Sequence, residues 1–166
     1  GIGQFVSKTW NNLKAQHPRD LADIDQAYKE ETEIPDNAID GRNDPQQSMV
    51  MLERLHKDIS KTLVRSGIRP DLTNIYMGHH FGAAQAVEFV KASGTSSMKD
   101  AYIKAFDSDE SGLKNWELVK DQNPWVRESM TISQFRNKIE YLLLVGASKQ
   151  MKWEEENGPF DPYNLP

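Results

Sequence analysis

Apolar residues along this chain recur three and four positions apart, a spacing that places them on one face of an α-helix. The pattern predicts a helix over residues 7–17, a short helix over residues 21–28 and a loop over residues 30–43. The clearest helix begins at Asp44-Pro45, where the aspartate can act as cap and the proline takes the first helical position. Its apolar positions are Leu52, Leu55, Ile59 and Leu63, and a glycine at position 67 should end it.

The second half of the chain continues the helical spacing. One helix is predicted from Asp71 to His79, and a second follows a bend at Gly82. A third is predicted over residues 98–106, and a fourth from a capping box at Thr131 to about residue 146. Residues 107–124 are predicted to be a polar loop that ends at an Asn-Pro break. No long stretch alternates as a β-strand does. The sequence therefore predicts an all-α domain over residues 1–146, followed by an extended tail over residues 147–166.

Composition and charge exclude several classes of protein. The longest apolar run, residues 141–145, is much shorter than the roughly 20 residues that a membrane-spanning helix needs. The net charge of −5 argues against a nucleic-acid partner, which requires a basic face. The chain has no cysteine, so disulfides and thiolate chemistry are excluded. A chain of 166 residues, of which 37% are hydrophobic, is long enough to form about one domain with a hydrophobic core.

Three motifs occur in a particular order. Residues 1–5 read Gly-Ile-Gly-Gln-Phe, residues 42–45 read Arg-Asn-Asp-Pro, and residues 76–86 contain Gly-His-His-Phe-Gly-Ala-Ala. This ordered set resembles the lytic transglycosylases of the lysozyme superfamily, in the form found in phage virion proteins. The resemblance covers residues 1–141, and it implies a lysozyme-like helical fold for the domain.

The resemblance implies a glycan-binding cleft made by Gln4, Phe5, Tyr76, His79 and His80. Gln4 would hold the glycan through its amide. His79 and His80 fall where related enzymes often carry a Tyr and an Asn beside the catalytic acid. The implied reaction is cleavage of the β-1,4 bond between N-acetylmuramic acid and N-acetylglucosamine, with no cofactor. The implied setting is a phage virion that opens the bacterial cell wall in the periplasm during genome delivery.

The catalytic acid of this family is a Glu on a helix that precedes the Gly-Gln segment. We therefore expect this Glu upstream of Gly1, outside the present chain. A single carboxyl group would act first as acid and then as base, so that the 6-hydroxyl of the sugar closes an anhydro ring. The expected partners are peptidoglycan glycan strands and other virion proteins, including a chain or segment that supplies the missing helix.

Glutamates within the chain are weaker candidates for this role. Glu30, Glu31 and Glu33 lie in a polar stretch that favours solvation. Glu53 and His56 have the spacing of a di-iron carboxylate motif, but such a site needs a second copy and two further Glu. A surface pair is the simpler interpretation of these two residues.

Residues 107–112 match the first half of an EF-hand calcium loop, with Asp107, Asp109 and a glycine at position 112. The bidentate glutamate should be the twelfth residue, but that position is Leu118, so these aspartates are weak metal candidates. An acidic turn beside a helix is the alternative. His79 and His80 are also unsuited to joint metal ligation, because neighbouring helical side chains diverge by about 100°.

The remaining aromatic residues have two interpretations each. Trp10, Trp116 and Trp125 are expected in the core more than in sugar stacking. The aromatic residues of the tail form either an arm that docks on another protein or a disordered end; these are Trp153, Phe160 and Tyr163. Three functional hypotheses follow: a peptidoglycan-degrading domain, an inactive structural component of a virion or tail assembly, and a helical calcium-binding module.

Overall fold

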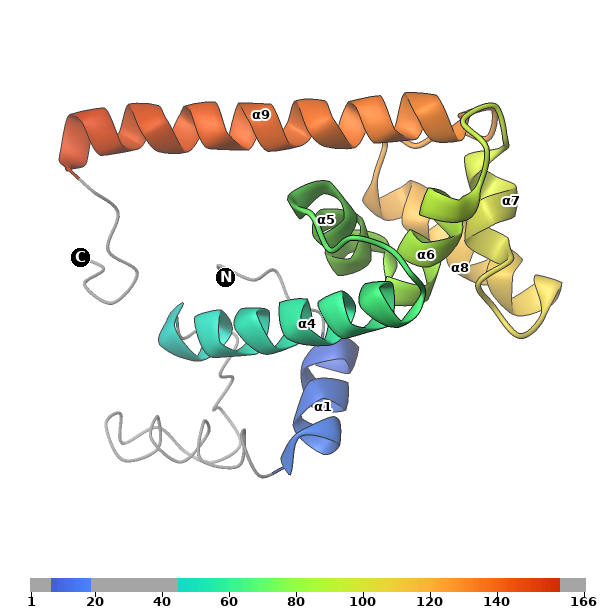
Figure 1. The fold of residues 1–166 in the computed structure, drawn as a ribbon, viewed down its shortest axis with the longest axis horizontal. Coiled ribbons are helices and arrows are strands. Elements are labelled where there is room, and N and C mark those ends of the chain that lie inside the picture. The colour runs from blue at the N-terminus through green and yellow to red at the C-terminus, as the bar shows by residue number, and fades with distance from the viewer. Residues whose placement is uncertain (1–6, 19–44, 159–166) are drawn as a thin grey trace. The chain divides into compact units, whose positions relative to one another are not determined.

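The computed structural model describes residues 7–18 and 45–158, and these residues form helices with no β-strand (Figure 1). The predicted all-α class is therefore confirmed for the part of the chain described. The helix predicted over residues 21–28 and the loop predicted over residues 30–43 lie outside it. The helices are α1 (Ser7–Gln16), α4 (Pro45–Arg65), α5 (Leu72–Phe81), α6 (Ala83–Lys91), α7 (Met98–Ile103), α8 (Asp109–Gln122) and α9 (Ile132–Asn157).

The chain divides into two compact units, and the division falls inside α4, between Lys57 and Asp58. In the first unit, Trp10 and Leu13 of α1 and Met51 of α4 form a small buried cluster. The predicted core position of Trp10 is confirmed, since only 4% of its surface is exposed. Leu55 packs against this cluster while remaining partly exposed.

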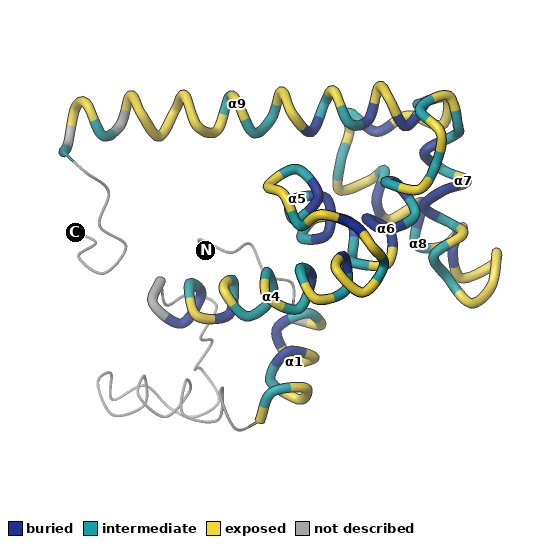
Figure 2. The backbone as a smooth tube through the Cα atoms, in the orientation of Figure 1, coloured by how far each residue is buried: buried dark blue, intermediate teal, exposed yellow. Residues whose placement is uncertain are grey.

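The second unit is built around aromatic side chains. In this unit α5 packs against α6 and α9, α6 against α7, and α7 against α8. The Phe135 ring lies 4.7 Å from Phe89 and 5.1 Å from Phe81, measured between ring centroids. Trp116 and Phe89 are fully buried, and Figure 2 shows the buried segments where these helices meet. The aromatic rings thus bring into contact helices that are distant in the sequence.

Two glycines allow helices to pack closely in this unit. A Cβ on Gly78 of α5 would collide with Ile59 Cγ2 of α4. A Cβ on Gly112 of α8 would lie 3.0 Å from the backbone Cα of Ile103, at the end of α7. Both contacts require a residue without a side chain, because a methyl group at either position would force the neighbouring helix away.

The helix ends follow local capping rules. Gly67, with φ of 73°, ends α4 in a Schellman arrangement in which Ile68 N–H donates to Leu63 C=O at 2.9 Å. Asp71 caps α5 by accepting from Asn74 N–H at 2.9 Å. The capping box predicted at the start of α9 is confirmed, with Thr131 and Gln134 bonded reciprocally.

The predicted polar loop over residues 107–124 is wrong, because most of it is helix α8. Ser108 caps this helix by accepting from Ser111 N–H, and Gly112, Trp116 and Val119 form its buried face. These buried residues are four and three apart, so the helical spacing is present in the sequence. The many charged residues around them made the segment resemble a loop. The break predicted at Asn123 is confirmed as the end of α8.

The predicted extended tail from residue 147 is also wrong up to Asn157, since α9 continues through Gly146 as a single helix. Residues 147–157 contain no proline, and Gln150 Nε2 donates to Glu154 Oε1 at 3.0 Å one turn later. The helix ends at Gly158, with φ of 85°. Beyond Ile139, no described side chain of α9 is buried (Figure 2). None of the helices described is long and apolar enough to cross a bilayer.

Candidate functional site

The best-defined candidate site in the described residues is one face of α5 near its C-terminus. Tyr76 and His80 are one turn apart, and their ring centroids are 4.2 Å apart with planes tilted by 41°. The His79 ring lies 4.8 Å from that of His80. The three side chains predicted for the glycan cleft therefore form one continuous cluster of rings, which we call the α5 ring cluster.

The α5 ring cluster lies at the protein surface. Tyr76 and His79 are partly buried, and His80 is exposed. The protein around the His80 ring lowers its pKa, because desolvation disfavours the charged imidazolium. Desolvation likewise raises the pKa of Tyr76. Both groups therefore favour their neutral forms, which suits contact with an uncharged sugar ring.

The other two predicted cleft residues, Gln4 and Phe5, lie outside the described residues. Their position relative to the α5 ring cluster stays a prediction. The same applies to Glu30, Glu31 and Glu33.

The α5 ring cluster is followed directly by a sharp joint. Gly82 ends α5 and is also the N-cap of α6, with φ of 106° and ψ of 147°. This backbone conformation is nearly restricted to glycine. The bend predicted at Gly82 is confirmed. The joint turns the chain immediately after His80 and Phe81, so Phe81 enters the aromatic core while the two histidines stay at the surface.

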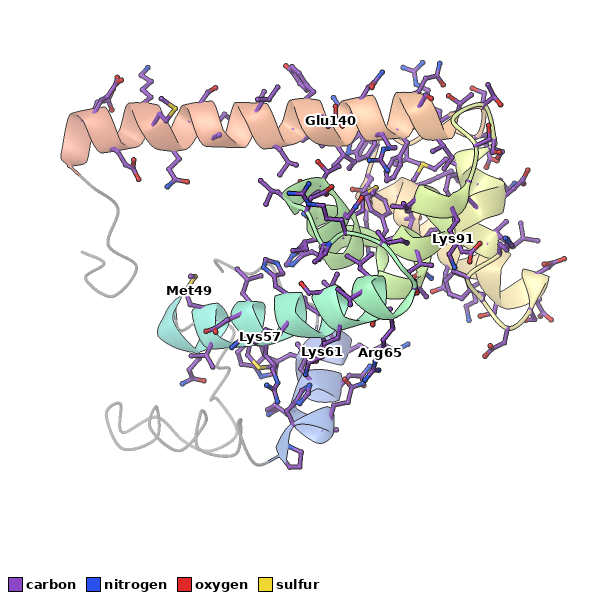
Figure 3. The ribbon with its side chains drawn as sticks, viewed as in Figure 1. Met49, Lys57, Lys61, Arg65, Lys91 and Glu140 are labelled. Atoms are coloured by element: carbon purple, nitrogen blue, oxygen red, sulfur yellow. The ribbon has the colours of Figure 1, made fainter. Side chains whose placement is uncertain are left out.

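A transglycosylase acid needs a raised pKa, since it must hold a proton before it protonates the leaving group. Glu53 does not meet this need: its carboxylate bonds Lys57 Nζ at 2.6 Å, which lowers its pKa. Two-thirds of its side chain is exposed, and its carboxylate pairs with Lys57, whereas the predicted surface pair is with His56. Figure 3 shows that Lys57, Lys61 and Arg65 lie on successive turns of α4. Glu53 is thus one member of an exposed charged surface.

The most strongly held carboxylate described is Glu128, which sequence reasoning missed. Its Oε1 accepts from Lys120 Nζ at 2.7 Å and from the Trp116 indole at 3.1 Å. Its Oε2 pairs with Lys99 Nζ at 2.9 Å. These contacts, with Lys120 the largest contributor, lower the pKa of Glu128 to about 2. A carboxyl group with this pKa is a poor proton donor at neutral pH. The contacts of Glu128 instead have a structural role, because they link α7, α8 and the segment before α9.

The calcium interpretation does not fit the structure. Helix α8 begins at Asp109, so residues 107–118 do not form the loop whose ligands surround a calcium ion. The glycine at position 112, which would make the sharp turn of an EF-hand, lies within α8 against Ile103. Among the residues that the structure describes, no group of three or more metal-ligating side chains is found. Asp107 and Asp109 thus flank the start of a helix.

A shallow depression of about 500 Å³ lies beside Asp109, between α7 and α8. Its two lysines are already paired: Lys99 with Glu128 at 2.9 Å and Lys104 with Glu88 at 2.8 Å. Their charges are therefore balanced without a ligand.

The tryptophans differ in how far they are buried. Trp116 is fully buried, and Trp125 lies with its ring centroid 6.2 Å from those of both Phe81 and Phe135. The core interpretation is therefore confirmed for Trp116, whereas Trp125 is only partly buried and lies at the edge of the aromatic core. The docking or disorder predicted for Phe160 and Tyr163 lies outside the described residues, whereas Trp153 belongs to α9.

Comparison with known proteins adds no assignment. No protein-family model, curated protein or solved structure matches this chain. The likeness to lytic transglycosylases thus rests on the motifs at residues 1–5, 42–45 and 76–86. Of these, the last is the motif that the structure describes fully, as the end of α5, the Gly82 joint and the start of α6.

Proposed function

We propose that this chain is the glycan-binding part of a lytic transglycosylase domain, carried in a phage virion to open peptidoglycan during genome delivery. The observation that supports the proposal best is the α5 ring cluster. The rings of Tyr76, His79 and His80 lie together at the surface, and the imidazoles add hydrogen-bonding atoms at the ring edges. Apolar faces with a few oriented polar groups are the usual composition of a small-molecule site.

The catalytic acid is proposed to be a Glu outside residues 1–166. Glu53 and Glu128 are both bonded to lysine, and the pKa of each is lowered. An acid–base Glu instead needs apolar surroundings that raise its pKa. The present chain by itself should therefore bind glycan strands without cleaving them.

Binding can be tested by cosedimentation of the 166-residue chain with purified peptidoglycan sacculi. We expect the chain to sediment with the sacculi, and Tyr76→Ala and His80→Ala each to weaken binding by about tenfold, equivalent to the loss of one well-packed ring contact. Tyr141→Ala is the matched control, because Tyr141 is an exposed tyrosine on α9, far along the chain from the α5 ring cluster. If the chain stays in the supernatant, or Tyr141→Ala weakens binding as much as Tyr76→Ala, the proposal is wrong.

The catalytic part of the proposal has its own test. A protein in which this chain is combined with the proposed Glu should clear a peptidoglycan suspension and release 1,6-anhydro sugars, whereas the present chain should not. Release of reducing sugars without the anhydro ring would indicate hydrolysis. No clearing by the combined protein would count against a transglycosylase.

A second candidate is an inactive structural component of a virion or tail assembly. It is favoured by the exposed apolar side chains of α9, of which Tyr141, Leu144 and Met151 are 58%, 68% and 63% exposed. Such a protein should self-associate or join an assembly and should not bind sacculi. Sedimentation velocity distinguishes the two candidates, since a stable monomer that binds sacculi supports only the first.

A further inference from the structure

Trp125 lies at the edge of the aromatic core of the second unit. Its ring is nearly parallel to that of Phe135, with the planes tilted by 11° and the centroids 6.2 Å apart. The Phe81 ring meets it edge-on, at 6.2 Å and 83°. These two contacts fix the orientation of the indole, yet the residue is only partly buried. Part of a large flat ring is therefore held at the surface.

The indole N–H of Trp125 has no partner among the residues that the structure describes. A buried tryptophan usually finds an acceptor for this donor, and Trp116 does so, since its N–H donates to Glu128 Oε1 at 3.1 Å. No such acceptor is present for Trp125 Nε1 in the same part of the chain. Nor does this nitrogen belong to the enclosed polar atoms found there, so it reaches solvent. Trp125 thus presents an open donor at the edge of its ring.

The chain around Trp125 is held on both sides. Val126 N–H donates to Asn123 C=O at 2.8 Å, which closes a turn around Trp125. The Asn123 side chain in turn donates to a carbonyl of α8 at 3.0 Å. On the other side, Glu128 is bonded to lysines of α7 and α8. A side chain fixed in this way loses little rotamer freedom when a ligand binds, so more of the contact energy contributes to affinity.

Trp125 adjoins the C-terminal turn of α5. Its contact there is Phe81, the residue that follows His80. Phe81 is buried while His80 is exposed, so the chain passes from the α5 ring cluster to the Trp125 contact within one residue. Both features belong to the second unit. The α5 ring cluster and Trp125 are therefore close enough along α5 to contact successive sugars of one glycan chain.

The ligand chemistry that fits Trp125 is that of a sugar ring. A pyranose has C–H groups on its faces and hydroxyl or acetamido oxygens around its edge. The face of an indole is weakly negative and favours the C–H groups, while its single N–H favours an oxygen acceptor. A purely apolar partner would cover the indole and leave its N–H without an acceptor, which is costly.

We infer that Trp125 is a further contact for the glycan strand, with its ring against a sugar and its N–H bonded to a hydroxyl or acetamido oxygen of that sugar. The inference rests on the proposed function, which supplies the ligand. It extends the binding surface from the α5 ring cluster to the turn between α8 and α9. The ligand class is a chain of uncharged N-acetylated sugars.

The test is an NMR titration of the whole isotope-labelled chain with an N-acetylglucosamine tetramer. Indole N–H signals lie apart from those of backbone amides, so each tryptophan can be followed separately. We expect the Trp125 indole signal to move until binding saturates. The Trp116 indole signal is the internal control and should stay, because its N–H is already bonded to Glu128. Equal movement of the two signals, or a stationary Trp125 signal, would overturn the inference.

Trp125→Phe separates glycan contact from core packing. Phenylalanine keeps a ring against Phe81 and Phe135 but lacks the N–H, so affinity for the tetramer should fall by about fivefold, equivalent to one hydrogen bond. Tyr102→Phe is the matched control and should leave affinity unchanged, because Tyr102 belongs to the same aromatic core and is only 4% exposed. Equal weakening by the two substitutions would contradict the inference. The indole titration needs no substitution, so it decides the question even if Trp125→Phe is destabilised.

The inference and the proposed function can fail separately. If the tetramer moves the resonances of Tyr76 and His80 but not the Trp125 indole signal, the inference is wrong and glycan binding stands. If it moves the Trp125 indole signal but neither Tyr76 nor His80, the Trp125 contact is supported and the α5 ring cluster is not the site. If it moves none of them, both are wrong.

Discussion

At the scale of single residues, glycines have opposite roles in this chain. Gly78 sits where a methyl group would collide with Ile59, so a larger residue there has no room. Gly146 lies on an exposed part of α9, where a Cβ would meet nothing within 4 Å. A glycine inside a helix costs about 1 kcal/mol relative to alanine. Close packing of two helices offsets that cost at Gly78 but not at Gly146.

Gly78→Ala should therefore lower the free energy of unfolding by about 1 kcal/mol or more, because the strain of overpacking exceeds the gain in helix propensity. Gly146→Ala should instead raise it by about 0.5–1 kcal/mol. Urea denaturation monitored by circular dichroism measures both. Combining Gly78→Ala with Ile59→Ala should cost less than the sum of the single changes, and strict additivity would contradict the contact.

Glu128 makes stability depend on pH. Its pKa in the folded protein is about 2, below the value in an unfolded chain, so its contribution is present above the unfolded value and is lost as pH falls through the folded one. Half of the side chain is exposed, so this contribution should be about 1 kcal/mol, less than the shift alone implies. Between about pH 5 and pH 2, Glu128→Gln should show a shallower loss of stability than the unmodified chain. Parallel pH profiles for the two proteins would show that the lysine contacts contribute nothing.

At the scale of elements, α9 shows that one helix can be held in two different ways. Its first turns are fixed by burial, with Ile132, Phe135 and Ile139 at most 1% exposed. Residues 147–157 are held by local forces, namely good helix-forming side chains and pairs such as Gln150 with Glu154. The first part should therefore be much more stable than the second.

Lys149→Pro tests the helical assignment of this second part. The proline should reduce the helical circular dichroism signal, because it removes a backbone hydrogen bond and clashes with the preceding turn. It should change the free energy of unfolding of the core by no more than about 0.5 kcal/mol, since Lys149 is exposed. Lys149→Ala is the control and should keep the helical signal. An unchanged signal in the proline variant would instead support an extended tail.

At the scale of the whole molecule, the chain divides into two compact units, and the described residues of each include buried side chains. The first unit contains Trp10, Leu13 and Met51, and the second contains the aromatic core around Phe89 and Phe135. The α5 ring cluster belongs to the second unit. Ligand contact with its rings should therefore persist when the first unit is weakened.

Leu13→Ala tests this independence. Removing a buried leucine should lower the stability of the first unit by about 2–5 kcal/mol. Hydrogen exchange should then accelerate at residues 7–17 and 45–57, while α6 and the first half of α9 keep their protection. Equal acceleration in both units would indicate that the chain unfolds as one cooperative body.

Local sequence signals predicted most helix starts but not all helix lengths. The caps at Asp71 and Thr131 and the bend at Gly82 were predictable, because each depends on a few neighbouring residues. Helix α8 was missed since its buried residues lie among many charged ones. Helix α9 ends later than predicted, because a single glycine such as Gly146 is tolerated in a helix that has strong helix formers on both sides.

The candidate site was predictable in its residue types but not in its arrangement. Tyr76 and His80 are four apart, so their proximity follows from the helix alone. The pairing of Glu128 with Lys99 does not, because these residues are distant in sequence and meet only when the segment before α9 passes α7. No local pattern predicts that contact.

The sequence by itself determined that this protein is helical, where most helices begin and which side chains form the α5 ring cluster. These properties depend on residues within one or two turns, which a chain carries before it folds. Tertiary structure alone decided that Glu128 is held by two lysines and that Gly78 and Gly112 are packing contacts. Each of these depends on what the rest of the fold brings to a residue, and burial is a property that no short segment has alone.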